Sequence, residues 1–144
     1  MDRIVVGLDG SEGSRLALAW ALDEARKRGD AVVEAVHSWD PPVLVGSPAG
    51  DMPPIPMDGT YETAAHQLLD HAIAAADTSG VTVEKVVLEG PAGSNLCERS
   101  ADAALLVVGS SGHGRVMDAL TGSVSRHCSH HAKCPVVVIP APKH

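Results

Sequence analysis

Four glycines and a serine near the C-terminal end of the sequence are spaced in a way that suits phosphate binding. The stretch reads GSSGHGRVMDALTGSVS and contains Gly109, Gly112, Gly114 and the pair Gly122-Ser123. Glycines that follow a strand can take positive φ and let backbone N–H groups approach an oxygen-rich ligand closely. The pair Gly122-Ser123 opens a predicted helix, whose free N–H groups and positive dipole end favour phosphate. The spacing alone also permits glycines that only turn the chain and a serine that only caps its helix.

Other polar side chains near these glycines have two interpretations each. Arg115 lies inside the glycine-rich stretch and could approach phosphate oxygens, or it could be a solvated loop residue. His113 is a weaker candidate because an ordinary histidine is mostly neutral at cytosolic pH. Ser123 and Ser125 add hydroxyl groups. Asp9 directly follows the first predicted strand, where an aspartate either caps the next helix or contacts a ligand.

A second polar cluster contains three histidines and two cysteines. His127 and His131 are four residues apart, a spacing that can place two imidazoles on one metal ion. Structural zinc sites usually carry clear pairs of cysteines or histidines, and the sequence offers no second pair of ligands. We therefore predict no metal site among His127, Cys128, His130, His131 and Cys134. No nucleophile and base can be paired from the sequence, so we also predict no catalytic residue.

The elements that must position these residues alternate between apolar strands and amphipathic helices. We expect strands at 3–8, 31–37, 81–88, 103–108 and 135–139, and helices at about 11–28, 60–77, 94–100 and 123–131. This alternation predicts an α/β fold in one domain over residues 1–144: an open five-stranded, mostly parallel sheet with helices on both faces. Ligands bind such sheets where the strand order reverses, which selects the positions after Leu8, His37 and Val108. A proline-rich segment at 39–59 is expected to form an irregular loop beside the ligand.

Composition narrows the classes of partner. The net charge of −7 argues against nucleic acid, and aromatic residues at 2% are too few for base-stacking platforms. Three cysteines leave one unpaired, which suits a reducing compartment. The sequence shows neither a secretion signal nor an apolar run of membrane-spanning length. We therefore expect a cytoplasmic protein without a membrane partner.

Four stretches of this sequence resemble one known family. The spacing Gly109-x2-Gly112-x9-Gly122-Ser123 resembles the nucleotide signature of ATP-binding universal stress proteins. IVVGLDGSEGS is similar to that family's first strand and loop, AVHSWD to the end of its second strand, and GSVSRHCSHHAKCPVVVIP to its last helix and strand. The resemblance implies a Rossmann-like fold of the adenine nucleotide alpha-hydrolase-like type. It also implies ATP binding, frequent dimerisation and a nucleotide-dependent switch in the stress response.

The resemblance also assigns site residues. Asp9, flanked by Gly7 and Ser11, would approach the adenosine, and Ser38 would face adenine through its backbone; that position is often aliphatic in the family. Gly109, Gly112 and Gly114 would hold ribose and phosphate, and Mg²⁺ would be carried on the phosphates. The remaining nucleotide-binding candidates lie in the loop and the helix start: Ser110, His113, Arg115, Gly122, Ser123, Val124 and Ser125.

Two alternatives and one assembly prediction complete this interpretation. The chain could be a slow ATPase or an adenylyl-transfer enzyme, although GLDGSEGS matches the phosphate loop of such transferases only in part. It could also be an interaction scaffold that has lost nucleotide binding. The short apolar strand Pro135–Ile139 is expected at a sheet edge, where it could pair with a second copy. We predict a homodimer joined through this strand.

Overall fold

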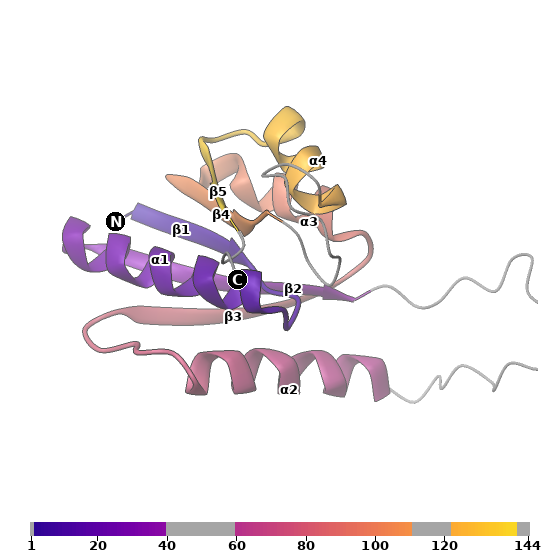
Figure 1. Ribbon diagram of the computed structural model, residues 1–144, viewed down its shortest axis with the longest axis horizontal. Coiled ribbons are helices and arrows are strands. Elements are labelled where there is room, and N and C mark those ends of the chain that lie inside the picture. Colours follow the sequence, from indigo (N-terminus) through magenta and orange to yellow (C-terminus); the bar gives the residue numbers. More distant parts are fainter. Residues whose placement is uncertain (1, 40–59, 111–121, 141–144) are drawn as a thin grey trace, which may run out of the picture.

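Five parallel strands form the sheet of this protein (Figure 1). The computed structural model describes residues 2–39, 60–110 and 122–140. The strands are β1 (Asp2–Gly7), β2 (Ala31–Trp39), β3 (Thr82–Glu89), β4 (Leu105–Gly109) and β5 (Val136–Ile139). They lie in the order β3-β2-β1-β4-β5, and each neighbouring pair runs parallel. The predicted open α/β fold is confirmed, with β5 at one edge.

Two pairs of helices cover the two faces of the sheet. The helices are α1 (Glu12–Arg28), α2 (Thr60–Ala74), α3 (Ala92–Arg99) and α4 (Ser123–His131), with a 3-10 turn at Ser100–Asp102. α1 and α2 pack with Ile4, Val6 and Val33 into one core, while α3 and α4 pack on the opposite face. Figure 1 shows α3 and α4 side by side. The sequence has no phenylalanine, and aliphatic side chains make up most of both cores.

The first helix follows its sequence signals closely. Ser11 is the N-cap, and its hydroxyl accepts a hydrogen bond from the Ser14 N–H. Gly29 ends the helix with φ 81°, and its N–H donates to the Ala25 carbonyl at 3.1 Å. The buried positions recur every three or four residues, so one face meets the sheet. Glycine at this position satisfies a terminal carbonyl because it tolerates the left-handed conformation.

Two predicted boundaries shift, one because of a local turn and one because of strand pairing. α2 ends at Ala74 rather than near 77, because Asp77 accepts a hydrogen bond from the Ser79 N–H in a turn that breaks the helix. β2 continues past His37 to Trp39, since β3 pairs with it to the end and the Gly90 N–H donates to the Trp39 carbonyl.

A charged side chain lies within the second face of the sheet. Glu34 on β2 is 1% exposed, and Arg99 Nε of α3 donates to its Oε1 at 2.6 Å. Arg3 on β1 lies 3.6 Å from the other carboxylate oxygen. The hydrogen bond to Glu34 raises the pKa of Arg99. This pair of a half-buried arginine and a buried glutamate anchors α3 to the sheet, and the sequence pattern gave no indication of it.

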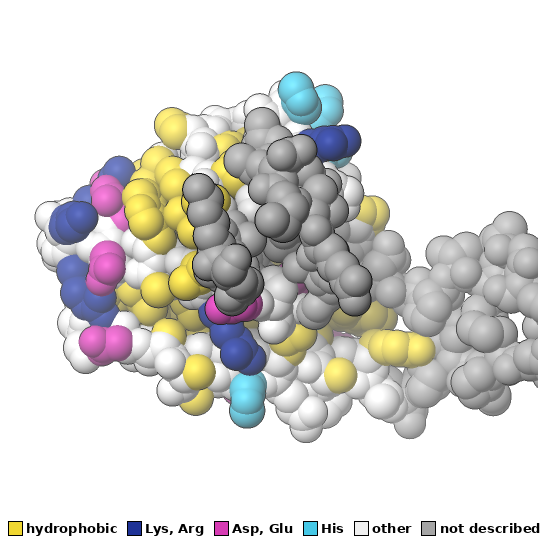
Figure 2. All heavy atoms as spheres, in the orientation of Figure 1, with side chains coloured by type: hydrophobic (Ala, Val, Ile, Leu, Met, Phe, Trp, Pro, Cys, Tyr) yellow, Lys and Arg dark blue, Asp and Glu magenta, His cyan; other side chains and the backbone are white. Residues whose placement is uncertain are grey.

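Charged side chains gather at the amino end of the sheet, where α1 ends (Figure 2). Arg28 donates to Glu24 at 2.9 Å and to Asp2 at 2.8 Å, while Arg26 donates to Asp23 at 2.9 Å. The opposite, carboxyl end of the sheet carries the candidate ligand residues. None of the helices in the described ranges is long and apolar enough to cross a membrane.

Candidate functional site

The strand order reverses between β1 and β4. This reversal places the starts of two helices at the carboxyl ends of these strands. β2 and β3 lie on one side of β1, while β4 and β5 lie on the other. α1 begins just after β1, and α4 follows β4. In open α/β sheets the crevice beyond this point is where ligands bind. Most of the predicted nucleotide-binding residues therefore lie near the carboxyl ends of the strands.

Gly109 brings the end of β4 against the start of α1. A Cβ at Gly109 would lie 2.9 Å from the backbone carbon of Gly13 and 3.3 Å from the Ser14 nitrogen. Only glycine fits without moving the helix backbone. A Cβ at Gly7 would instead meet a terminal methyl of Leu96 at 2.8 Å, which can rotate away. Gly109 thus has a packing role that its sequence position alone did not reveal.

Asp9 caps the turn that leads into α1, one of the two interpretations that its sequence position allowed. Its Oδ1 accepts hydrogen bonds from the N–H of Ser11, at 2.9 Å, and from the Ser11 hydroxyl. The Ser14 hydroxyl closes the network by donating to the Ser11 carbonyl at 2.9 Å. Gly10 takes φ 85°, which turns the chain between Asp9 and the helix. This network fixes Asp9 at the strand end.

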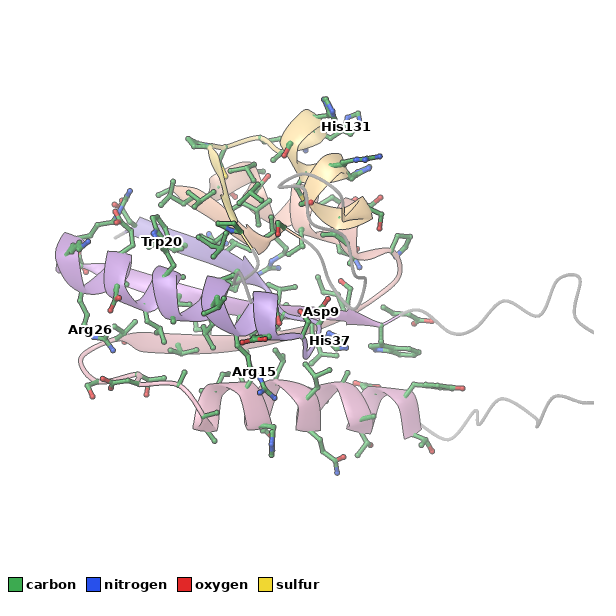
Figure 3. The ribbon with its side chains drawn as sticks, in the orientation of Figure 1. Asp9, Arg15, Trp20, Arg26, His37 and His131 are labelled. Atoms are coloured by element: carbon green, nitrogen blue, oxygen red, sulfur yellow. The ribbon has the colours of Figure 1, made fainter. Side chains whose placement is uncertain are left out.

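The ends of β1 and β2 are joined by a histidine (Figure 3). His37 Nδ1 lies 2.7 Å from the Leu8 carbonyl oxygen, and because a carbonyl only accepts, Nδ1 carries the proton. His37 therefore holds the segment that leads to Asp9. Ser38 points to the other face, where Asn95 Nδ2 donates to its hydroxyl at 3.1 Å. Its side chain is engaged by α3, so a backbone contact with adenine remains compatible with this geometry.

Hydrogen bonds at Ser110 join the end of β4 to the start of α4. The Gly122 N–H donates to the Ser110 carbonyl at 2.9 Å, and the Ser110 N–H donates to the Ile139 carbonyl at 2.9 Å. The Ser125 hydroxyl lies 3.1 Å from the Ser110 carbonyl and 3.0 Å from that of Gly122. Ser125 is 1% exposed, so its proton is used in joining the two segments rather than being directed outwards.

The first turn of α4 has no side-chain cap among the described residues. Gly122 is the N-cap with φ −72°, and the first intrahelical bond is donated by Arg126 to the Gly122 carbonyl. The N–H groups of Ser123, Val124 and Ser125 precede that bond and have no acceptor within the helix. Ser123 is exposed and Val124 half-buried. The positive end of the helix is therefore presented at the sheet edge.

Four of the predicted ligand residues cannot be placed. Gly112, His113, Gly114 and Arg115 lie outside the described residues, so their part of the glycine-rich stretch stays a prediction. The structure brings together the other ten at the carboxyl ends of β1, β2 and β4: Gly7, Asp9, Ser11, Ser38, Gly109, Ser110, Gly122, Ser123, Val124 and Ser125.

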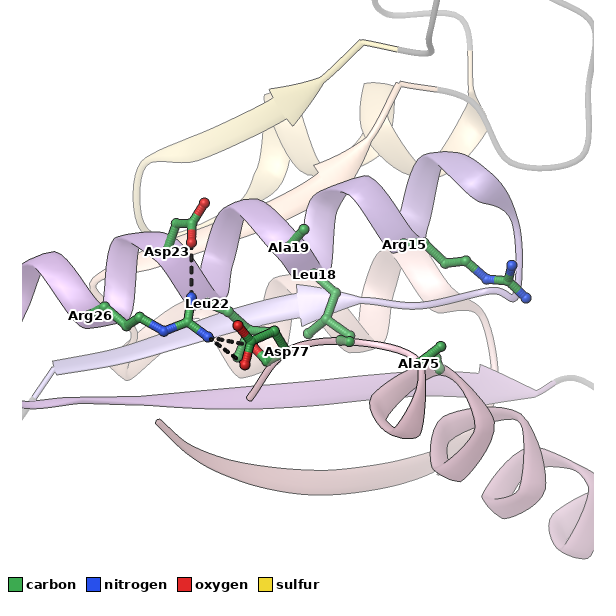
Figure 4. Close-up of a pocket in the computed structure, with 10 residues that line it drawn as sticks. Arg15, Leu18, Ala19, Leu22, Asp23, Arg26, Ala75 and Asp77 are labelled. Carbon is green, nitrogen blue, oxygen red and sulfur yellow. Dashed lines mark hydrogen bonds and ion pairs between the residues drawn. The ribbon is translucent and has the colours of Figure 1, made fainter. Parts of the chain in front are cut away.

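A cavity of about 280 Å³ lies elsewhere, between α1 and α2 (Figure 4). Leu18, Leu22 and alanines of both helices line it. Arg26 at one end is already held by Asp23 and by the Asp77 carbonyl. The residues that line this cavity lie within or after the helices and not at a helix start. The cavity therefore lacks the free N–H donors that suit a phosphate.

The profile of the universal stress protein family matches residues 1–140 of this chain. The chain belongs to the universal stress protein family. A universal stress protein of Mycobacterium tuberculosis is 37% identical over 135 residues, which cover 94% of this chain and 44% of that protein. One from Mycolicibacterium smegmatis is 34% identical over 139 residues, covering 94% and 45%. The chain thus spans less than half the length of these curated relatives.

Solved structures of the family share the fold. A universal stress protein family member from Burkholderia pseudomallei is 29% identical, with a TM-score of 0.68 over 97% of this chain and 96% of that one. A universal stress protein in complex with cAMP is 22% identical, with a TM-score of 0.66 and 98% of each chain covered. An Arabidopsis thaliana family protein with AMP bound is 20% identical, with a TM-score of 0.59 over 96% and 91%.

Sequence reasoning missed three residues that shape the edge of this universal stress protein. Gly13 gives β4 its close contact with α1, His37 ties β2 to the Leu8 carbonyl, and Asn95 engages Ser38. The Gly13 contact is made by its backbone, so the residue type at that position was no signal for it. The roles of His37 and Asn95 depend on contacts across 29 and 57 residues, which no local pattern encodes.

Proposed function

We propose that this universal stress protein binds an adenine nucleotide at the strand-order reversal and acts as a nucleotide-dependent switch in a cytoplasmic stress response. The phosphates of ATP, with Mg²⁺ on them, would lie at the start of α4. The adenosine would lie towards Asp9 and the backbone of Ser38. The stretch that holds Gly112, His113, Gly114 and Arg115 would complete the phosphate side.

The first turn of α4, which no described side chain caps, is the observation that carries this proposal. Phosphate oxygens accept hydrogen bonds, and the N–H groups of Ser123, Val124 and Ser125 are donors without intrahelical acceptors. Gly109 and Ser110 hold this turn beside the end of β1. Related proteins supply the nucleotide class, since one was solved with cAMP and one with AMP.

A charge placed at the α4 start tests the position of the phosphates. Gly122→Glu keeps a backbone conformation that glutamate can adopt, because Gly122 has φ −72°. We expect at least a tenfold loss of ATP affinity by calorimetry, from repulsion between the carboxylate and the phosphates. Ser129→Glu is the matched control, because it adds the same charge to an exposed position later in α4. Unchanged affinity in Gly122→Glu would show that the phosphates lie elsewhere.

Titrations with ATP, ADP, AMP and cAMP test the ligand class itself. Binding of none of them by the intact chain would overturn the proposed function. Incubating the chain with ATP and Mg²⁺ overnight separates a switch from an enzyme, and we expect the ATP to remain intact. A switch also requires that ATP bind one conformation or assembly better than another.

We further propose that a homodimer forms through β5. All four residues of this edge strand are apolar and half-buried. The Leu106 N–H donates to the Pro135 carbonyl and the Ser110 N–H to the Ile139 carbonyl. The backbone N–H and C=O groups of the odd-numbered residues of β5 therefore point towards β4. The N–H and C=O groups of Val136 and Val138 therefore point away from β4, towards a possible partner strand.

A proline at one outward position tests this dimer. Val138→Pro removes an outward N–H and leaves the hydrogen bonds to β4 in place. We expect light scattering after size exclusion to give the monomer mass for Val138→Pro and the dimer mass for Val138→Thr, which keeps the N–H. A monomeric wild-type chain, or a dimeric Val138→Pro variant, would contradict pairing through this edge.

A further inference from the structure

The C-terminal half of α4 carries histidines that the nucleotide proposal does not use. Figure 2 shows histidine side chains gathered at the end of the molecule formed by α4, and Figure 3 shows His131 projecting there. The rings of His127 and His131 have centroids 4.6 Å apart and planes inclined by 41°. Two imidazoles one helical turn apart at this separation can reach a single metal ion.

The ring of His127 is held in place by the neighbouring helix. A Cβ at Gly93 of α3 would lie only 3.0 Å from His127 Cδ2 and Cγ, so the ring rests directly against the α3 backbone. His127 is half-buried and His131 is exposed. One imidazole is therefore fixed before a metal arrives, which lowers the entropy cost of binding.

The position on the helix also favours a cation. His131 is the last residue of α4, where the helix dipole presents its negative end. Imidazole nitrogen suits zinc, copper and nickel, whereas magnesium prefers oxygen. In the described ranges no group of three or more metal-ligating side chains could share an ion, so water would complete the coordination.

We propose that His127 and His131 form a two-imidazole surface site for a divalent late transition metal such as Zn²⁺ or Cu²⁺. The sequence predicted no metal in this cluster because it offers no second pair of ligands. The ring separation and the support from Gly93 are the structural observations that alter that judgement. Along the axis of α4, at about 1.5 Å per residue, His131 lies about 13 Å from Gly122 and His127 about 7.5 Å from it. Neither histidine belongs to the proposed nucleotide site, so the metal site is testable without nucleotide.

Calorimetric titration of the untagged chain with ZnCl₂ or CuCl₂ tests the site. We expect one ion per chain, Cu²⁺ bound more tightly than Zn²⁺, and no binding of Mg²⁺. His131→Ala should weaken Zn²⁺ binding at least tenfold, and since this side chain is exposed the fold should be unaffected. His127→Ala should have the same effect.

His130→Ala is the matched control, because it removes an adjacent imidazole whose ring centroid is 6.4 Å from that of His131. Its Zn²⁺ affinity should stay within twofold of the wild-type value. Nitrogen hyperfine splitting in the Cu²⁺ spectrum should report two imidazoles in the wild type and one in His131→Ala. The absence of one-to-one binding, or an unchanged affinity in His131→Ala, would overturn the proposal.

Discussion

α1 and α4 begin at the same edge of the sheet but satisfy their first turns in opposite ways. At α1, Ser11 caps the helix, Asp9 accepts from the Ser11 N–H, and Ser14 closes the network. At α4, the N-cap is Gly122, and no described side chain caps the turn. The two helix starts therefore differ in their side-chain caps: α1 has one, and α4 has none among the described residues.

The far ends of the two helices extend this contrast. α1 has 17 residues and ends in a glycine cap with ion pairs from Arg26 and Arg28. α4 has nine residues and rests mainly on Cys128, which is fully buried. Burial and the neighbouring Cys97 raise the pKa of the Cys128 thiol to about 12, so it acts as an apolar side chain. α1 is thus the longer helix with caps at both ends, and α4 the shorter one.

Ligand binding should give the largest difference between the two helix starts. If ATP binds at α4, ATP at 100 times its Kd stabilises the fold by about 2.7 kcal/mol. Thermal unfolding measures the total effect. Hydrogen exchange should slow at the amides of Ser123, Val124 and Ser125 while those of Ser14 and Arg15 change little. Protection confined to the α1 start would reverse the comparison.

A methyl group at the contact between β4 and α1 should give the next largest effect. Gly109→Ala places Cβ against the Gly13 backbone, which cannot rotate away. Overpacking of this kind costs about 1–3 kcal/mol, and we expect about 2 kcal/mol by urea unfolding. Gly7→Ala is the control because its Cβ meets side-chain methyl groups of Leu96 and Val108 rather than backbone, and it should cost clearly less. Equal losses would mean that the α1 start moves as easily as a side chain.

Removing one hydroxyl from each helix start measures how much its side chain contributes to stability as a cap. Ser11→Ala removes the acceptor of the Ser14 N–H and should cost about 1 kcal/mol of unfolding free energy. Ser123→Ala removes an exposed hydroxyl that caps nothing in the described structure and should stay within about 0.5 kcal/mol of wild type. Similar losses in both variants would show that α4 is capped after all.

The smallest expected effect concerns the segment that anchors the end of α1. Hydrogen bonds from Ser79, and then the Arg26 charge, lower the pKa of the Asp77 carboxyl. The ionised form is thus favoured in the folded state, so this contribution is present at neutral pH and is lost as acid protonates Asp77 below its unfolded pKa. Asp77→Asn should slightly lower stability at pH 7, less so in high salt, and not at all near pH 2. A difference that grew towards low pH would contradict this assignment.

Local patterns predicted the elements well because each signal acts over a few residues. α1 lies between Ser11 and Gly29, close to the predicted range 11–28, and α4 runs from Ser123 to His131 as predicted. The end of α2 was misplaced because Ser79 captures Asp77 in a turn, a competition that helical periodicity does not register. The buried Glu34 was missed because its partner Arg99 lies 65 residues away.

The candidate site was predictable in its residue types but not in their partners. Asp9 and Ser125 were identified as polar residues at the right strand and helix ends. Their hydrogen bonds turn partly inwards, to Ser11 and to the Ser110 and Gly122 carbonyls. Those acceptors and donors become neighbours only once the chain folds, so spacing could not distinguish a cap from a ligand contact.

The sequence by itself determined the alternation of strands and helices and the glycine-rich signature at Gly109–Ser123, because propensity, periodicity and turn chemistry are local. Tertiary structure decided which helix start is capped, which glycine must stay a glycine and which histidines meet. Those outcomes depend on the β1–β4 reversal that sets Gly109 against Gly13, and on the packing of α3 that fixes His127 beside His131. Contacts between distant segments have no local pattern, and they set the chemistry of both ends of α4.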